Sequence, residues 1–271
     1  MNIDIEYFSD TNVGLVRKVN EDSHGNALTP LGHVFVLCDG MGGHVGGAIA
    51  SKMAVECILK YLENEIFESH TMAIANAMSF ANTQVFARAQ HDPSLSGMGT
   101  TCTVAIVTNA GEVYYGHVGD SRIYMFTGGE LLRLTRDHSF VQLLVDLGQI
   151  SEDDAERHPN KNQILRAIGI EESVEPEVAP HPVLPQKGDI FLLCSDGLCG
   201  MTTDSAIEQT MKSMEAKEAA SSLIEIALAN GGKDNITITL ISFKKTINKN
   251  IEKQNYREHE TPLKREKRKM E

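Results

Sequence analysis

Short runs of apolar and β-branched residues recur along the chain, separated by polar turns, and they predict β-strands. A hairpin loop, Thr108 to Gly111, joins two of these runs, and Gly128-Gly129 marks another turn. Neighbouring strands are therefore expected to run antiparallel. The predicted strands are 33–38, 101–107, 112–118, 121–126, 189–194 and 235–243.

Other stretches repeat their apolar residues every three to four positions, which is the spacing of a helix with one buried face. Ala50, Ala54 and Ile58 form one such series. We expect Thr71 to cap the second helix and Gly231-Gly232 to end the last. The predicted helices are 47–66, 71–90, 139–147, 203–214 and 216–229.

The order of these elements does not alternate between strand and helix, so it disfavours a parallel βαβ sheet. It favours an α+β fold with helices packed on antiparallel sheets. One domain is predicted over 1–243, followed by a tail over 244–271. Within the domain, 137–187 is rich in histidine and proline and carries the acidic run SEDDAE, so we interpret it as an excursion from the core that acts as a lid.

The charge of the chain limits the kinds of partner that it is expected to bind. The chain of 271 residues is 41% hydrophobic, enough for a sizeable core, and its net charge is −12. An acidic protein does not attract nucleic acid or an anionic membrane through its overall field, so no nucleic-acid partner is expected. The tail is basic, with ten Lys/Arg against five Asp/Glu. It is expected to be a solvated, flexible extension, and a basic tether for nucleic acid, lipid or an acidic partner is the alternative.

Cysteine usage and hydropathy indicate the compartment. Five cysteines lie mostly in apolar runs, without a CxxC pair, and are typical of buried core residues rather than disulfides. The N-terminus has no signal-peptide pattern, and no apolar run approaches the ~18 residues of a membrane span. The cytoplasm is therefore the expected compartment.

Acidic residues stand at the ends of several predicted strands. Asp39 and Asp196 each follow a long apolar run and precede a glycine, which permits a close approach of backbone. Further candidates are Asp234 before a strand, Asp120 between two strands, and the pair Glu21-Asp22. An oxygen-rich set without matching His and Cys residues selects hard cations such as Mg²⁺ or Mn²⁺.

The ordered motifs resemble the metal-dependent type 2C protein phosphatase family, particularly its bacterial branch. This resemblance implies a four-layer α-β-β-α sandwich, in which helix pairs flank two antiparallel sheets. The motifs are SDTNVGLVRKVNED (9–22), VLCDGMGGHVGG (36–47), GTTCTVAIV (99–107), HVGDSRIY (117–124), LTRDHS (134–139), ILRAIG (164–169), LLCSDGL (192–198) and KDNITI (233–238).

The resemblance also implies a role for each acidic residue. Asp39 would bridge two cations, Mn²⁺ or Mg²⁺, and the carbonyl of Gly40 would bind one of them. Asp196 and Asp234 would bind the other. Residues 139–165 would form a flap beside the site. The remaining implied roles are a water-mediated contact from Glu21, support from Asp22, and a weaker third cation at Asp120 with Asp196.

The implied reaction is hydrolysis of phosphoserine or phosphothreonine in proteins by a water that the two cations share. Arg17 would grip the phosphate, because a guanidinium offers two parallel N–H donors. Some relatives have a histidine directly after the Asp-Gly motif as a proton donor, whereas this chain has Met41, and His44 lies three residues further on.

Three alternative hypotheses remain open beside the protein phosphatase. The chain is alternatively a catalytically inactive relative that binds phosphoproteins or partners, a metallohydrolase for a small phosphoester, or a regulator that its tail holds to a membrane or a scaffold. An inactive relative is expected to lose metal ligands or Arg17, and this chain keeps them all. The expected partners are phosphorylated proteins and an opposing bacterial serine/threonine kinase in signalling, and the chain is expected to be a monomer.

Overall fold

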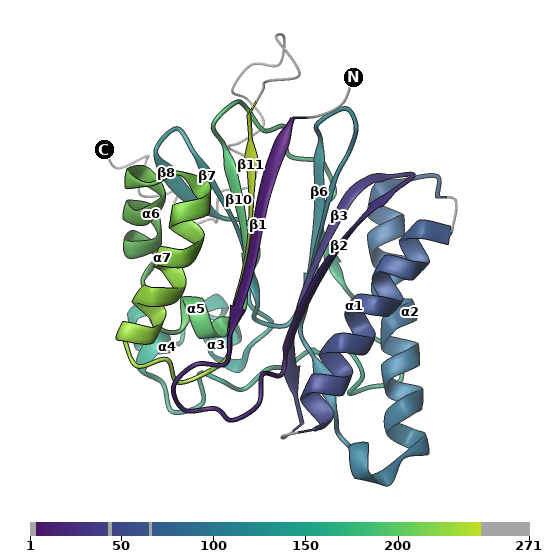
Figure 1. Cartoon of the computed structure of the whole chain (residues 1–271). Helices are drawn as coiled ribbons and strands as arrows, with labels where there is room; N and C mark the ends of the chain where they lie inside the picture. Colours follow the sequence, from purple (N-terminus) through teal and green to yellow (C-terminus); the bar gives the residue numbers. More distant parts are fainter. Residues whose placement is uncertain (1–3, 43–44, 65–66, 245–271) are drawn as a thin grey trace.

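The computed structural model describes residues 4–42, 45–64 and 67–244. Figure 1 shows two antiparallel β-sheets face to face. The first sheet has the order β1 (Ile5–Asn12), β11 (Ile236–Phe243), β10 (Ile190–Cys194), β7 (Arg122–Thr127) and β8 (Glu130–Arg133). The second has the order β2 (Asp22–Thr29), β3 (Gly32–Met41), β5 (Cys102–Val107), β6 (Val113–Val118) and β9 (Glu177–Val178), and β4 (Gly99–Thr100) pairs with β3.

A pair of helices covers the outer face of each sheet (Figure 1). On the second sheet these are α1 (Gly46–Asn64) and α2 (His70–His91), and on the first they are α6 (Asp204–Ser213) and α7 (Ala216–Ala229). The prediction of an α+β, four-layer α-β-β-α sandwich is confirmed. The shorter helices are η1 (Pro93–Leu95), α3 (Phe140–Asp146), α4 (Glu152–Arg157) and α5 (Asp196–Cys199).

Each interface between layers has its own apolar core, which explains why the central strands are continuously apolar rather than alternating. In β3, Val34 and Val36 point into the core beneath α1 and α2. Phe35 and Leu37 point the other way, into the core between the sheets. A strand buried on both faces has no solvent side that would demand polar residues.

The predicted helices are present with small shifts at their ends. One detail was wrong: the N-cap of α2 is Ser69, whose side chain accepts a hydrogen bond from Met72 N, and Thr71 bonds to the Ser69 hydroxyl instead. The glycine ending of α7 is confirmed, since Gly231 N and Gly232 N donate to the last carbonyls of the helix. Residues 65–66 of the predicted helix 47–66 lie outside the described residues, as does the tail from 245 onward.

The sequence pattern did not predict the four edge strands β1, β2, β8 and β9, of which β1 and β2 are the longest. β1 and β2 each carry many polar residues, because only part of each edge strand is buried. Their strand conformation comes from long-range pairing, β1 with β11 and β2 with β3. Local propensity does not encode such pairing, since it depends on burial and on cross-strand neighbours.

The segment 137–187 divides into two parts. Its first part carries α3 and α4, and it closes on itself where Ser139 bridges Ile164. Its second part returns along the second sheet, where Ile168 bridges Thr100 and Val183 bridges Val113. Ile168 and Val183 are both buried in the core, so the second part is not an excursion from it.

Two further observations bear on the earlier expectations. No helix within residues 4–42, 45–64 and 67–244 is long and apolar enough to cross a membrane. All five cysteines are free, and Cys38, Cys102 and Cys194 are buried. The cysteines therefore serve as small core residues, as their apolar neighbours predicted.

Candidate metal and catalytic site

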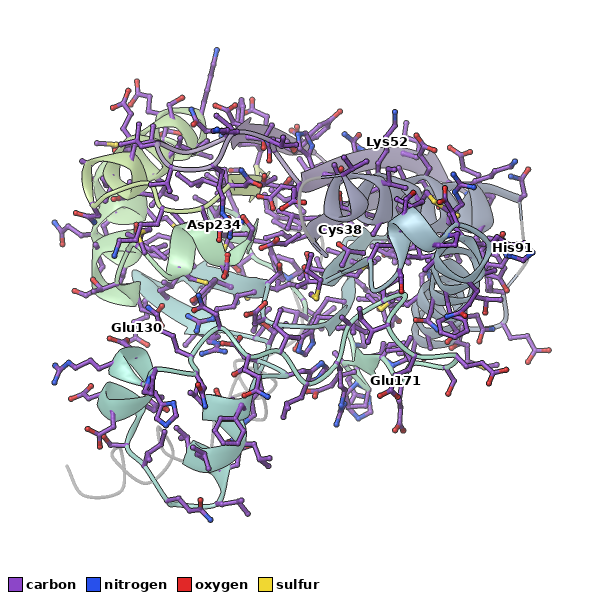
Figure 2. The ribbon with its side chains drawn as sticks, turned by 90° about the horizontal axis from the view of Figure 1, so that it is seen from below. Cys38, Lys52, His91, Glu130, Glu171 and Asp234 are labelled. Atoms are coloured by element: carbon purple, nitrogen blue, oxygen red, sulfur yellow. The ribbon has the colours of Figure 1, made fainter. Side chains whose placement is uncertain are left out.

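The five strand ends that carry the acidic residues meet at one end of the sandwich. Strands β3, β6 and β10 finish there, whereas β2 and β11 begin there, as their antiparallel registers require. This is the lower end in Figure 1, and Figure 2 looks onto it, with Asp234 between the two helix pairs. The acidic residues singled out from the sequence all lie at or next to these strand ends.

Asp22 and Asp39 face each other across β2 and β3. Thr101, between β4 and β5, holds Asp39: its hydroxyl accepts a hydrogen bond from Asp39 N at 2.9 Å, and its own N–H donates to Asp39 O at 2.8 Å. The Thr101 hydroxyl also lies 2.7 Å from the hydroxyl of Ser121, next to Asp120. One threonine therefore supports two candidate ligands.

Asp196 stands where β10 turns into α5. Its neighbour Ser195 joins the two sheets: the Ser195 hydroxyl accepts a hydrogen bond from Thr237 N at 2.9 Å and donates one to Asp22 Oδ2 at 2.8 Å. A carboxylate of the second sheet is thus fixed by a hydroxyl of the first.

Asp234 precedes β11 and forms an ion pair with Arg17, whose Nη2 lies 2.7 Å from Asp234 Oδ2. The adjacent Asn235 anchors the loop that carries Arg17. Its side chain accepts from Glu21 N at 2.8 Å and donates to Val13 O at 2.9 Å and Val19 O at 3.0 Å. Arg17 and Asp234 are thereby held at the same edge of the site.

The carboxylates disfavour one another's charge. Burial, followed by the charges of Asp22 and Asp196, raises the pKa of Asp39 well above its usual range. Burial followed by the charge of Asp196 does the same to the pKa of Asp120, and burial followed by the charge of Asp234 raises the pKa of Asp196. Burial raises the pKa of Asp22 to about 7, against the hydrogen bond from Ser195.

Such a set fits divalent cations. Three of its buried oxygens have no hydrogen-bond partner within the described chain: Glu21 Oε1, Asp22 Oδ1 and Asp120 Oδ1. Buried polar atoms are normally paired, so these oxygens are candidates for contact with an ion or its water. Carboxylate oxygens are the ligands that Mg²⁺ and Mn²⁺ prefer, and a cation would remove the repulsion that raises the pKa values.

The two glycines that follow the strand-end aspartates have a steric role. A Cβ on Gly40 would lie 2.2 Å from Gly47 O, and a Cβ on Gly197 would lie 1.9 Å from Asn235 O. Both distances are far below contact, so any side chain would push the aspartate-bearing turn away from its neighbour. The expected close approach of backbone is therefore present at both positions.

Sequence reasoning did not assign a role to Thr101, Ser195 or Asn235, which support the acidic residues from behind. All three are buried polar residues inside the motifs quoted above. A polar residue at the end of an otherwise apolar strand is the signal that marks them, because burial without a hydrogen bond would be unfavourable.

The family model "Protein phosphatase 2C" matches residues 16–229. The chain is 36% identical over 236 residues to the serine/threonine protein phosphatase PstP of Mycobacterium tuberculosis, an alignment that covers 87% of this chain and 44% of PstP. It is 37% identical over 241 residues to the serine/threonine phosphatase stp of Listeria welshimeri, covering 85% of this chain and 93% of that protein.

Solved structures agree with the sequence relatives. A crystal structure of the catalytic domain of PstP in complex with two manganese ions has a TM-score of 0.78 and 34% sequence identity to this chain. The match covers 89% of this chain and 99% of that domain. The chain thus spans less than half of full-length PstP but nearly all of its catalytic domain.

Proposed function

The chain belongs to the protein phosphatase 2C family, and we propose that it hydrolyses phosphoserine and phosphothreonine in proteins with the help of divalent cations. The observation that carries this proposal is the convergence of five aspartates at one end of the sandwich, with partnerless buried oxygens among them. All five, together with Arg17 and Glu21, match the family motifs, which disfavours an inactive binding module. The five are Asp22, Asp39, Asp120, Asp196 and Asp234.

In this proposal Asp39, the carbonyl of Gly40, Asp196 and Asp234 hold two cations, Mn²⁺ or Mg²⁺. Asp120 holds a weaker third with Asp196. Glu21 contributes through water, and Asp22 supports Asp39 from the neighbouring strand. When bound, the cations supply an activated water near neutral pH and neutralise charge on the phosphoryl oxygens.

Arg17 positions the phosphate. Its guanidinium has five N–H donors, and the ion pair with Asp234 engages one nitrogen. The side chain is 48% exposed, so its remaining donors are open to a ligand that arrives from solvent. Arg17 therefore lies where a phosphate can reach both the guanidinium and the acidic centre.

The residues also bear on the proton steps. Met41 follows Asp39-Gly40 and has no proton to give, so we propose that water protonates the leaving alcohol. The other candidate donor, His44, lies outside the described residues. A cysteine nucleophile is not required. Burial raises the pKa of the Cys38 thiol well above its usual range, which disfavours a thiolate there.

The cellular setting follows from the same proposal. The substrates are phosphorylated proteins, and a serine/threonine kinase in the same cell opposes the enzyme. The free cysteines support a reducing compartment, the cytoplasm. We propose that the enzyme acts as a monomer, because each residue of the candidate site comes from one chain.

The test compares phosphothreonine and phosphotyrosine peptides of one sequence with a small aryl phosphate, in Mn²⁺, in Mg²⁺ and in chelator. Hydrolysis that requires a cation and favours phosphothreonine is expected. A clear preference for phosphotyrosine or for the aryl phosphate would refute the substrate assignment. A folded protein without activity in either metal would point to the inactive binding module instead.

A further inference from the structure

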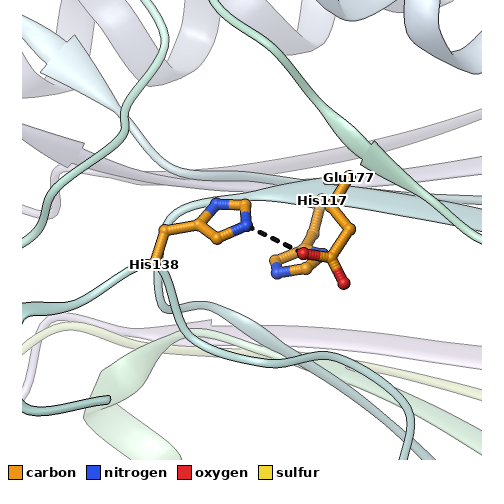
Figure 3. Close-up of side chains that lie close together, drawn as sticks. All are labelled: His117, His138 and Glu177. Carbon is orange, nitrogen blue, oxygen red and sulfur yellow. Dashed lines mark hydrogen bonds and ion pairs between the residues drawn. The ribbon is translucent and has the colours of Figure 1, made fainter. Parts of the chain in front are cut away.

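A second group of ligand-type side chains lies beside the acidic site. His117 on β6 faces Glu177 on β9 across the sheet, and His138 approaches from the segment after β8. One candidate ligand atom of each lies within 4.8 Å of the others, and Figure 3 shows the three side chains together. The imidazole rings stack, with centroids 4.5 Å apart and an angle of 19° between planes.

The placement of protons argues against a metal ion in this group. His138 Nδ1 accepts a hydrogen bond from Gly119 N at 3.2 Å, so the ring proton is on Nε2, which donates to Glu177 Oε2 at 3.3 Å (Figure 3). His117 Nε2 likewise donates to Arg136 O at 2.8 Å. A metal at His138 Nε2 would need that proton removed and the bond to Gly119 broken, because a metal-bound imidazole donates through its other nitrogen.

His138 instead holds the backbone turn that precedes Asp120. His138 N donates to Gly119 O at 2.9 Å, while its ring accepts from Gly119 N. These two hydrogen bonds grip both polar groups of the residue directly before Asp120. Asp120 has a buried oxygen that finds no hydrogen-bond partner among the described residues, so the direction of its carboxylate depends on this backbone.

The preceding residue grips the other side of the same turn. Asp137 accepts hydrogen bonds from Arg122 Nε and from Arg122 Nη2, the latter at 2.8 Å, and it also pairs with Arg133. Asp137 and His138 therefore fix the residues on either side of Asp120, at positions 119 and 122. The same short segment leads into α3, and Leu165 N donates to His138 O at 2.7 Å where the excursion returns.

We propose that His138, oriented by Glu177, is a positioning residue that aims the Asp120 carboxylate at its cation. This inference rests on the proposed role of Asp120. The ring of His138 acts through its Nδ1 lone pair on Gly119 N–H, and the Glu177 carboxylate keeps the ring proton on Nε2. His117 provides a stacking surface that limits rotation of the ring.

Two variants of nearly equal size separate the two ends of the ring. In His138→Asn, the amide oxygen stands near the position of Nδ1 and can still accept from Gly119 N–H, but the contact with Glu177 is lost. In His138→Gln, the amide reaches the position of Nε2 and can still bond Glu177, but Gly119 N–H is left without an acceptor. Titration calorimetry with Mn²⁺ measures binding directly, and melting temperature in chelator confirms that each variant folds.

We expect His138→Gln to weaken the weakest Mn²⁺ binding step by about 10- to 100-fold, the usual effect of losing a group that orients a metal ligand. His138→Asn should bind Mn²⁺ nearly as wild type does. Equal losses in both variants, or no loss in either, would overturn the positioning role. An extra binding step that disappears in His117→Asn would also overturn it, because the cluster would then be a metal site.

Asp120→Asn separates this inference from the proposed function on which it rests. It should abolish the weakest Mn²⁺ binding step. If Asp120→Asn binds Mn²⁺ as wild type does, the assignment of Asp120 as a ligand fails. If it loses that step while His138→Gln keeps it, only the role of His138 fails.

Discussion

At the scale of single residues, the acidic end of the sandwich is a set of carboxylates that burial and mutual repulsion make costly to ionise. Asp39, Asp120 and Asp196 all have a raised pKa for these reasons. Arg17 and Arg122 offset part of the repulsion at Asp196. The stability of the metal-free protein should therefore respond to pH and to any neutral substitution at these positions.

Asp22 gives the clearest pH prediction. Its pKa in the folded protein is about 7, above the usual value of 3.8, so the folded state keeps a proton that the unfolded chain has released. The stabilisation from that proton is fully present below pH 3.8 and is lost as pH rises through about 7. In chelator, the melting temperature of the wild type should fall relative to that of Asp22→Asn between about pH 4 and 7, and the difference should level off above that.

The comparison with Asp22→Asn matters because other groups titrate nearby. Burial lowers the pKa of His117 to about 4, so His117 alone makes the protein less stable as pH falls from its usual value of 6.5 towards 4. That effect is common to both proteins and cancels in the difference. Parallel melting curves for the two proteins would contradict the assignment of a raised pKa to Asp22.

The candidate ligands were accessible from the sequence because each aspartate stands beside a recognisable apolar strand. The residues that support these ligands could not be found from the sequence. Ser195 meets Asp22 from the opposite sheet, and Asn235 meets Glu21 from the other end of the chain. Which hydroxyl or amide reaches which carboxylate depends on how the two sheets are offset, and a single sequence does not contain that offset.

At the scale of elements, the central strands and the long helices were predictable, whereas the edge strands were not. β3 and β5 each have a long apolar run because both of their faces are covered. β2 is a polar edge strand that is ordered by β3, and it nevertheless begins with Asp22. Some of the elements that carry site residues are therefore those whose secondary structure is least evident from the local sequence.

The junction between the sheets gives a prediction at this scale. Ser195→Ala removes the hydroxyl that links Asp22 to Thr237 N, and it leaves that buried N–H without a partner. We expect a loss of about 1–3 kcal/mol in the free energy of unfolding. Activity should fall about 10- to 100-fold, since a ligand support is lost. Urea denaturation and peptide hydrolysis measure the two effects.

Ser9→Ala is the matched control for that variant. The Ser9 hydroxyl lies 2.9 Å from the Thr239 hydroxyl, in the same sheet but away from the acidic end. Its loss should leave the Mn²⁺ requirement and the hydrolysis rate unchanged. If the two serine variants lose activity equally, Ser195 has no special part in holding the site.

The excursion that carries α3 and α4 gives a second prediction about a structural element. It is closed by the Ser139–Ile164 bridge and by a hydrogen bond from Phe140 N to Gln163 O, and α4 buries no residue. Val141 of α3 is the one buried residue among 141–162, so replacing this segment with a short Gly-Ser linker should cost about 1 kcal/mol and lower the melting temperature by about 2–4 °C. Hydrolysis of phosphopeptides should fall while that of a small aryl phosphate stays the same. Equal losses on both substrates would argue against a role of this segment in substrate choice.

At the scale of the whole molecule, three apolar cores hold the four layers together, and all lie within the described residues. The last hydrogen bond of the first sheet joins Lys244 N to Asp4 O at 2.9 Å. A chain ending at Lys244 should accordingly keep the melting temperature and the peptide hydrolysis rate of the full chain. A lower melting temperature after truncation would mean that residues 245–271 contribute to the fold.

Asp39 is proposed to hold two cations at the acidic end, and direct counting of bound Mn²⁺ tests this role. Titration calorimetry of the wild type should show at least two Mn²⁺ per chain. Asp39→Asn should lose both tight steps, yet its melting temperature in chelator should equal or exceed that of the wild type, because a repelling charge is gone. If Asp39→Asn binds the same number of ions with the same affinity, Asp39 does not hold the two cations.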